Sequence, residues 1–274
     1  MKLQDKLKEL RSLRKAILAA NFYNLETLQA VVSAASGAHA PVILQVSESS
    51  IRYMGLHMAV AMARKALEDS GVEGWLHLDH GGSIGLVQQC LDAGFDSVMI
   101  DASELPVKEN IRISREAVRK AGPYGACVEA ELGYIAKLRQ TQDGSGFTQP
   151  EDAVLFTEET GVHALAVSIG SAHGFYKKEP SLDIGLLARI REAVETPLVL
   201  HGSSGIPDDM LIRAIENGIC KVNLATETKN AFMQQLKKEL TGTDEIDLRI
   251  VFPAATAAAR ELIAGKLRII HQDH

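Results

Sequence analysis

Short apolar runs alternate with amphipathic segments along the whole chain. The apolar runs predict eight strands, at about residues 17–21, 41–46, 75–79, 97–101, 126–131, 164–169, 197–201 and 220–224. The segments between them carry helix signals, such as Asn24 ahead of LETLQAVVSAA and Pro207 ahead of DDMLIRAIENG. Alternating strands and helices predict an α/β fold, and eight is the strand number of the (β/α)8 TIM barrel.

A polar side chain stands near the carboxyl end of every predicted strand. These residues are Asn21, Ser47, Asp79 with His80, Asp101, Glu131, Ser168 with His173, His201 and Asn223. Buried parallel strands are nearly apolar, so such polar groups are costly unless they bind something. Active sites of (β/α)8 barrels lie at this end of the strands. The pattern therefore favours a closed barrel over an open doubly wound sheet, which uses the same alternation but leaves two edge strands.

Length and composition agree with one barrel domain covering residues 1–274. The chain is 46% hydrophobic and 23% charged, which is typical of a globular protein with a sizeable core. We expect a short helix before the first strand and a helical extension at the C-terminus. No stretch approaches the roughly 18 apolar residues that span a membrane, and the charged N-terminal segment does not read as a secretion signal.

Charge and cysteine content narrow the expected partners and compartment. The formal net charge of −6 gives no reason to expect nucleic acid or an anionic membrane as a partner. Cys90, Cys127 and Cys220 are widely spaced and form no CxxC pair, so a disulfide framework or a structural zinc module is not expected. These features predict a cytoplasmic protein in which any anion is bound at a local site.

Three histidines stand just past apolar runs, each beside glycine: His80 in LDHGGS, His173 in GSAHG and His201 in LHGSSG. Alone, each would be a hydrogen-bonded residue at a strand end. If the runs are strands of one barrel, the three imidazoles converge at one mouth. Three protein ligands with an open fourth position are typical of catalytic zinc sites. The sequence therefore predicts a zinc centre held by these histidines.

Carboxylates accompany the predicted zinc ligands. Asp79 adjoins His80, and we expect it to act as the catalytic acid or base, with the orientation of a ligand as the alternative role. Asp101 and Glu131 are expected either behind the ligands or as alternative metal contacts. Glu129 should face the same way as Glu131, and His77 the same way as Asp79, because side chains two apart in a strand share a face. His80 should then point the opposite way unless its strand has ended.

A glycine- and serine-rich turn, HGSSG at 201–205, precedes a predicted helix. Backbone amides of Gly202 and Gly205, with the hydroxyls of Ser203 and Ser204, would form an anion cradle. The segment KVNLAT adds Asn223 and Thr226 from the eighth strand. Loops after strands seven and eight of such barrels frequently bind phosphate.

Five ordered motifs resemble the class II, zinc-dependent fructose- and tagatose-bisphosphate aldolases: LDHGGS, VEAELG, IGSAHGFYKKEPSLD, LHGSSGIP and KVNLATE. The resemblance implies a homodimeric or homotetrameric barrel that reversibly cleaves a phosphorylated ketose into dihydroxyacetone phosphate and an aldehyde. It implies Zn²⁺ on the three histidines, proton transfer by Asp79, and a monovalent cation, Na⁺ or K⁺, near the glycine-rich loops. The residues it implies for phosphate binding are Gly174, Gly202, Ser204, Asn223 and Thr226.

The segment after Glu131 departs from the family pattern. Residues 137–150 are polar and contain glycine, so we expect a mobile loop facing the mouth. Its only carboxylate is Asp143, which leaves the base for the carbon-bound proton unassigned. Lys137 and Arg139 are candidates for an anionic end of the substrate, and Arg260 is a candidate for a second phosphate.

This departure keeps other functions open. One is an aldolase for a modified substrate, such as a deoxy, keto-acid or sulfonated sugar phosphate. Another is a catalytically silent barrel that binds metal and sugar phosphate. A zinc hydrolase is less attractive, because the phosphate cradle indicates a phosphorylated substrate.

Overall fold

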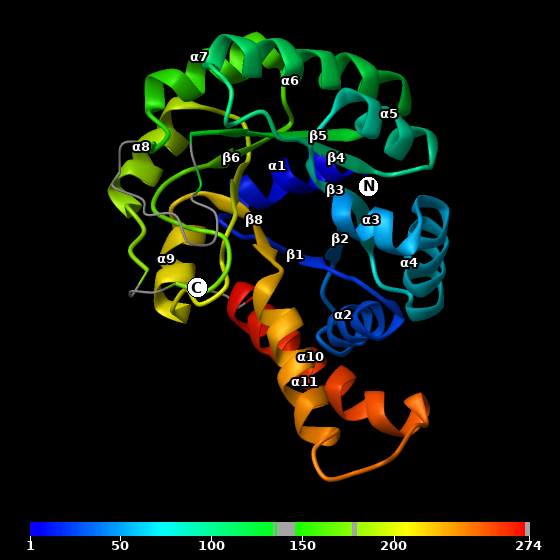
Figure 1. Ribbon diagram of the computed structural model, residues 1–274. Helices are drawn as coiled ribbons and strands as arrows, with labels where there is room; N and C mark the ends of the chain where they lie inside the picture. Colours follow the sequence, from blue (N-terminus) through cyan, green and yellow to red (C-terminus); the bar gives the residue numbers. More distant parts are fainter. Residues whose placement is uncertain (134, 136–145, 177–179, 272–274) are drawn as a thin grey trace.

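Eight parallel strands close into a barrel in the computed structural model, which describes residues 1–133, 135, 146–176 and 180–271 (Figure 1). The strands follow chain order around the barrel, and β8 pairs with β1. Their bounds are β1 Ile17–Asn21, β2 Val42–Ser47, β3 Gly74–Gly81, β4 Ser97–Ile100, β5 Cys127–Leu132, β6 Ala164–Val167, β7 Leu198–Leu200 and β8 Ile219–Leu224. The predicted TIM barrel is confirmed, the open-sheet alternative is wrong, and predicted strand bounds differ from those observed by at most two residues.

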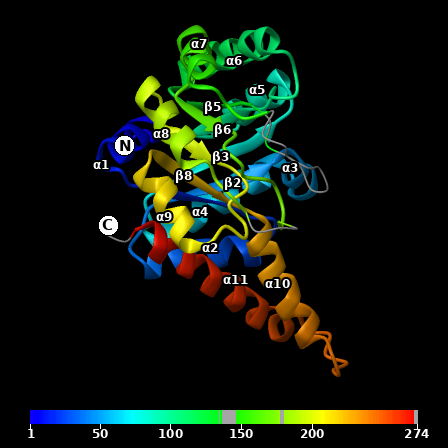
Figure 2. The same cartoon turned by 90° about the vertical axis from the view of Figure 1, so that its left-hand side faces the viewer.

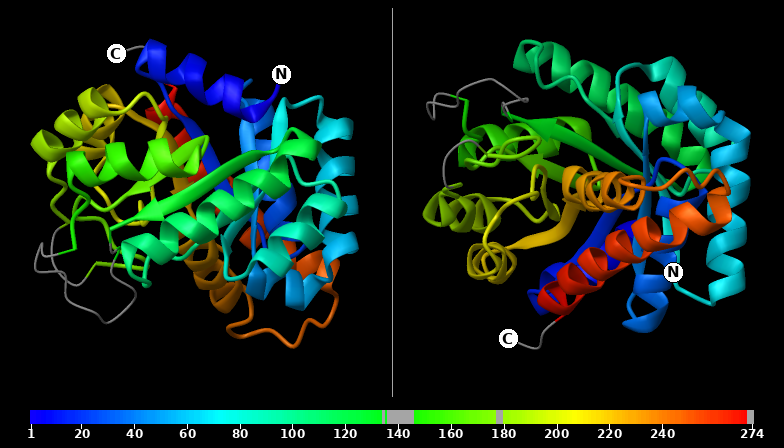
Figure 3. Two further views of the ribbon diagram at one scale, coloured as in Figure 1. Left: turned by 90° about the horizontal axis from the view of Figure 1, so that it is seen from above. Right: turned by 60° about the horizontal axis from the view of Figure 1, so that its bottom comes forward.

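Helices surround the barrel and connect its strands (Figure 3). Helix α2, the first that connects two strands, begins in a capping box, in which the side chains of Asn24 and Thr27 each form a hydrogen bond with the other's backbone. The helices are α1 Leu3–Leu13, α2 Leu25–Gly37, α3 Glu48–Met54, α4 Leu56–Ser70, α5 Ile84–Asp92, α6 Val107–Ala121, the short 3-10 helix η1 Gly122–Tyr124, α7 Pro150–Thr160, α8 Ile184–Ala193, α9 Asp208–Glu216, α10 Thr226–Glu239 and α11 Leu248–Ile270.

Two buried cores form because each strand presents alternate residues to its two faces. Outward-facing residues such as Leu18 and Leu44 pack against the surrounding helices. Inward-facing residues such as Ile17 and Trp75 pack at the amino-terminal end of the barrel with Leu7 of α1. Helix α1 contributes Leu3, Leu7 and Leu10, whose spacing places them on one helical face, and it closes this end of the barrel. The opposite, carboxyl-terminal end is left for polar groups.

Helices α10 and α11 form a hairpin that extends away from the barrel (Figures 1 and 2). Helix α11 packs along α2, and its last turn returns beside α1 (Figures 2 and 3). In the described parts of the chain, no helix is both long and apolar enough to cross a membrane.

Candidate active site and metal centre

Inward-facing side chains change from apolar to polar along the barrel axis. In β3 the inward positions are Trp75, His77 and Asp79, all buried. In β5 the corresponding positions include Glu129 and Glu131, which are 1% and 2% exposed. The predicted pairing of faces within these strands is thus observed. Carboxylates buried this deeply require cationic or hydrogen-bonding partners, and these lie at the carboxyl end of the barrel.

A backbone irregularity in β3 brings two adjacent side chains to one site. His80 has φ +49, a left-handed conformation that is uncommon outside glycine, and the pairing register with β4 shifts between Leu78 and Gly81. The strand continues to Gly81, so it has not ended at His80. The irregularity replaces the simple alternation, and the side chains of Asp79 and His80 come within 4.0 Å of each other.

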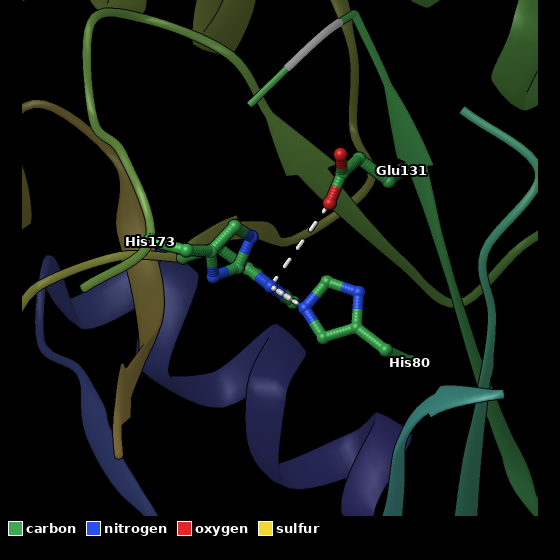
Figure 4. A group of neighbouring side chains, drawn as sticks. His80, Glu131 and His173 are labelled. Atoms are coloured by element: carbon green, nitrogen blue, oxygen red, sulfur yellow. Dashed lines mark hydrogen bonds and ion pairs between the residues drawn. The ribbon is translucent and has the colours of Figure 1, made fainter. Parts of the chain in front are cut away.

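Four side chains form a group that could hold a metal ion. One ligand atom each from His80, Glu131, His173 and His201 lies within 4.8 Å of all the others. The side chains of His80, Glu131 and His173 point toward one another in Figure 4. His201 Nδ1 lies 3.0 Å from His80 Nε2 and 4.0 Å from Glu131 Oε2. The structure therefore brings the three predicted histidines together, and it adds Glu131 rather than Asp101 as a fourth candidate ligand.

Carboxylates behind the group orient two of its imidazoles. Asp101 Oδ2 lies 2.7 Å from His80 Nδ1, and Glu129 Oε1 lies 2.8 Å from His201 Nε2. Burial raises the pKa of Asp101, but the hydrogen bond and charge of His80 outweigh it and hold that pKa below its usual range. Two ionised carboxylates thus accept hydrogen bonds from the outer ring nitrogens, which leaves His80 Nε2 and His201 Nδ1 directed at the centre.

The centre fits a divalent cation by its donor atoms and its unsatisfied charge. Glu131 Oε2 is buried and has no hydrogen-bond partner among the residues that the structure describes. Burial, and then the charge of Asp101, raises the pKa of Glu131 to about 8. Burial lowers the pKa of His80, but the charge of Asp79 and the hydrogen bond to Asp101 outweigh it and raise that pKa to about 9. Three imidazoles with one carboxylate are a donor set that suits zinc.

Asp79 lies beside this group as an ionised carboxylate. Its Oδ2 accepts a hydrogen bond from Asn21 Nδ2 at 2.8 Å, and Asn21 in turn accepts one from Gln45 at 3.0 Å. Burial raises the pKa of Asp79, but the charges of His80, His201 and Lys221, with the Asn21 bond, lower it to about 2. At neutral pH this carboxylate can therefore accept a proton.

A buried ion pair below the group was not anticipated. Lys221 Nζ donates to Glu129 Oε2 at 2.8 Å, and both side chains are almost inaccessible to solvent. Lys221 also lies 3.4 Å from His77 Nε2, and His77 Nδ1 lies 2.7 Å from Ser97 Oγ. The sequence contains one signal for this ion pair: Lys221 is two residues before Asn223, so both side chains point into the barrel. A lysine facing the interior of a barrel requires a carboxylate partner.

The predicted phosphate cradle is assembled from three loops, but two of its donors are already used. Ser203 Oγ donates to the backbone oxygen of Asn223 at 2.5 Å, and Gly205 N donates to Glu227 Oε1 at 2.8 Å. The expectation that these two groups face an anion is therefore wrong. Ser204 Oγ accepts from Glu227 N at 3.2 Å and keeps its proton for a ligand.

The remaining cradle residues lie at loop ends around the mouth. Gly174 and Gly202 have φ +89 and φ +65, which brings their backbones into conformations that favour glycine. Thr226 begins α10, and Asn223 Nδ2 lies 3.0 Å from His201 Nε2. The carbonyl oxygen of the Asn223 side chain is buried, and within the described ranges it has no hydrogen-bond partner. Amide, hydroxyl and helix N-terminal groups of this kind can bind an anion, and Asn223 places one of them beside the four-residue group.

A pocket of about 470 Å³ opens beside His80 and His173, within the size range of small-ligand sites. Its other lining residues are Gly82, Asp101, Ala102, Glu104 and Leu105. Arg260 lies elsewhere, in a cavity bounded by α2 and α11, so the structure does not bring it to its own chain's mouth. Lys137, Arg139 and Asp143, with most of the predicted mobile loop, lie outside the described residues.

Comparison with known proteins identifies the family of the chain. Residues 1–274 match the sequence model of the family described as fructose-bisphosphate aldolase class-II. A fructose-bisphosphate aldolase of Geobacillus stearothermophilus is 39% identical over an alignment of 254 residues that covers 90% of this chain and 88% of that protein.

Two solved structures of proteins described as aldolases superpose on this chain over nearly its whole length. The YdjI aldolase of Escherichia coli K12 superposes with a TM-score of 0.89 at 33% identity, covering 99% of this chain and 97% of that one. A putative fructose-1,6-bisphosphate aldolase of Coccidioides immitis has a TM-score of 0.89 at 29% identity, covering 98% and 96%.

Proposed function

The chain belongs to the class II fructose-bisphosphate aldolase family, and we propose that it uses zinc to cleave a phosphorylated ketose of the fructose or tagatose 1,6-bisphosphate type reversibly. The products are dihydroxyacetone phosphate and an aldehyde. The observation that carries this proposal is the convergence of His80, Glu131, His173 and His201 within 4.8 Å, beside the ionised Asp79.

The metal would be held by His80, His173 and His201, with Glu131 as an alternative contact. When bound, it would supply Lewis-acid stabilisation of the negative charge that develops on the three-carbon product during cleavage. Asp101 and Glu129 would keep His80 and His201 in the tautomers that face the metal, because each accepts a hydrogen bond from the outer ring nitrogen.

Asp79 would accept the proton of the substrate's C4 hydroxyl during cleavage and return it to the aldehyde oxygen during condensation. The lowered pKa keeps this carboxylate ionised before substrate binds, so it is free to accept a proton. Asn21 fixes one of its oxygens at 2.8 Å. The other lies 3.4 Å from Asn223 Nδ2 and is the oxygen left for the substrate.

The phosphate of the three-carbon unit would bind to Gly174, Gly202, Ser204, Asn223 and Thr226. Support comes from their positions after β6 and β7, near the end of β8 and at the start of α10, around the same mouth as the metal ligands. Backbone amides and the start of α10 favour an anion there. On the basis of the family resemblance, the protein would also bind a monovalent cation and assemble into dimers or tetramers.

A coupled assay tests the reaction. Purified protein with zinc is incubated with ketose 1-phosphates, 1,6-bisphosphates and their deoxy, keto-acid and sulfonated analogues, and release of dihydroxyacetone phosphate is followed by NADH oxidation. We expect release from at least one substrate and loss of that signal with EDTA. Zinc binding without release from any substrate would reject the proposal.

A single substitution tests the proton-transfer role. Asp79→Ala should retain zinc but lose at least about 100-fold in turnover, the usual contribution of a general acid or base. Full activity in this variant would reject the role assigned to Asp79. Zinc content, measured on the same samples, separates loss of chemistry from loss of metal.

A further inference from the structure

We propose that Tyr176 is a positioning residue whose hydroxyl ties the loop after β6 to the loop after β7. These loops carry His173 with Gly174 and His201 with Gly202, so the tie would set both the metal ligands and the phosphate donors. The inference rests on the proposed function of those groups.

The Tyr176 hydroxyl makes two hydrogen bonds to backbone. It accepts from Ala172 N at 2.9 Å, within its own loop, and donates to Gly202 O at 2.7 Å in the other loop. Ala172 directly precedes His173, and Gly202 directly follows His201. One hydroxyl therefore closes the short turn that contains His173 and joins it to the residue next to His201.

The two loops are in backbone contact at this point, so small displacements matter. Gly202 has φ +65, and a Cβ built on it would lie only 2.3 Å from the backbone oxygen of Ala172. A Cβ on Gly205 would lie 3.5 Å from Tyr176 Cδ2, so the ring lies close against Gly205. The partly buried ring also packs against the outer core. Removing the hydroxyl alone should leave the ring in place and release only the tie.

The hydroxyl remains a donor at physiological pH. Burial raises the pKa of Tyr176 to about 12, even though the Ala172 bond acts in the opposite direction. The phenol therefore keeps its proton, and the bond to Gly202 O persists across the pH range in which an aldolase would be assayed.

The loop after β7 is also tied on its other side. Ser203 Oγ bonds the backbone of Asn223, and Ser204 Oγ accepts from the backbone of Glu227 at the start of α10. Tyr176 supplies the corresponding link toward the loop after β6. Side-chain hydrogen bonds thus link the three segments of the proposed cradle one to the next. Tyr176 makes the link to the loop that carries His173 and Gly174.

The test compares Tyr176→Phe with Tyr124→Phe. Tyr124 is a matched control, because its hydroxyl also bonds two partners, Asp92 and Gln88, but precedes β5 at the amino-terminal end of the barrel. Calorimetry would measure zinc binding to the metal-free chains and then dihydroxyacetone phosphate binding to the zinc-loaded chains. Kinetics would separate KM from kcat.

We expect Tyr176→Phe to bind both zinc and dihydroxyacetone phosphate on the order of tenfold more weakly, the effect of losing two neutral hydrogen bonds. KM for the ketose phosphate should rise more than kcat falls, and Tyr124→Phe should match the wild type in all these measurements. Unchanged zinc and dihydroxyacetone phosphate binding in Tyr176→Phe would overturn the proposal. Equal weakening in Tyr124→Phe would overturn it too, because the effect would then follow from general destabilisation.

Failure of the proposed function gives a different result. Wild-type protein that binds zinc and dihydroxyacetone phosphate but cleaves no ketose phosphate would reject the aldolase reaction. The two binding measurements would still decide the role of Tyr176, because neither requires turnover.

Discussion

Lys221→Met removes one charge from the buried ion pair below the proposed metal centre. Glu129 would keep its bond to His201 but lose the ammonium 2.8 Å from its other oxygen. Burial raises the pKa of Glu129, yet the charge of Lys221 and the bond from His201 hold it well below the usual range. The substitution therefore leaves a carboxylate, 1% exposed, without its main counter-charge, so it must either stay ionised and unpaired or take up a proton against its normal pKa.

The expected loss of stability is about 3–5 kcal/mol, the usual cost of breaking a buried pair by removing one partner. The double variant Lys221→Met, Glu129→Gln removes both charges, while the glutamine oxygen can still accept from His201 Nε2. Replacing a whole buried pair is often neutral, so the double variant should be the more stable of the two. The coupling energy between the positions should be at least about 2 kcal/mol.

Urea unfolding of the metal-free proteins at pH 7, with EDTA present, measures these differences. The exposed pair of Arg112 and Glu109 provides a control, and Arg112→Met should leave the urea midpoint close to that of the wild type. If Lys221→Met unfolds no more readily than the double variant, the reasoning about the pair is refuted. Zinc affinity should also fall about tenfold in the double variant, because an amide orients His201 less strongly than a carboxylate does.

Two further predictions concern the two ends of the barrel. The metal-free protein should lose stability as the pH rises from 6.5 to 9. The raised pKa values of His80, about 9, and Glu131, about 8, make the folded chain bind more protons than the unfolded chain in this range. Urea midpoints that stay constant over this range would contradict these shifts. Leu7→Ala should lower the free energy of unfolding by about 2–5 kcal/mol, because it leaves a cavity where α1 closes the barrel. The folded fraction should keep the wild-type kcat, and a lowered kcat would show that the two ends are coupled.

Local signals account for the parts of the site that the sequence predicts. Strand positions follow from short apolar runs, and the mouth follows from the polar residues that end them. No local signal predicts the conformation of His80. Its φ of +49 interrupts the alternation of side chains along the strand, and the predicted direction of His80 depended on that alternation.

Pairings across the barrel are also hidden from local patterns. Glu129 and Lys221 are 92 residues apart and meet only when β5 and β8 face each other across the closed interior. Composition likewise shows that Ser203 and Gly205 carry donors, but not that Asn223 and Glu227 already accept their hydrogen bonds. The three histidines were more predictable, because each ends or follows a strand beside glycine.

The charges at the mouth explain why protons and a divalent ion should compete for the same place. Asp79 and Asp101 are ionised, while His80 and Glu131 are both protonated at neutral pH in the metal-free protein. A zinc ion bound by His80 and Glu131 would displace about two protons, so the net charge of the buried group would not change. Lys221 already balances Glu129, which leaves that carboxylate free to orient His201. The two raised pKa values therefore differ in their first cause, since burial raises that of Glu131, whereas burial lowers that of His80 and the charge of Asp79 raises it. They share a second one, because the carboxylates at this mouth carry more negative charge than the described cations near them neutralise.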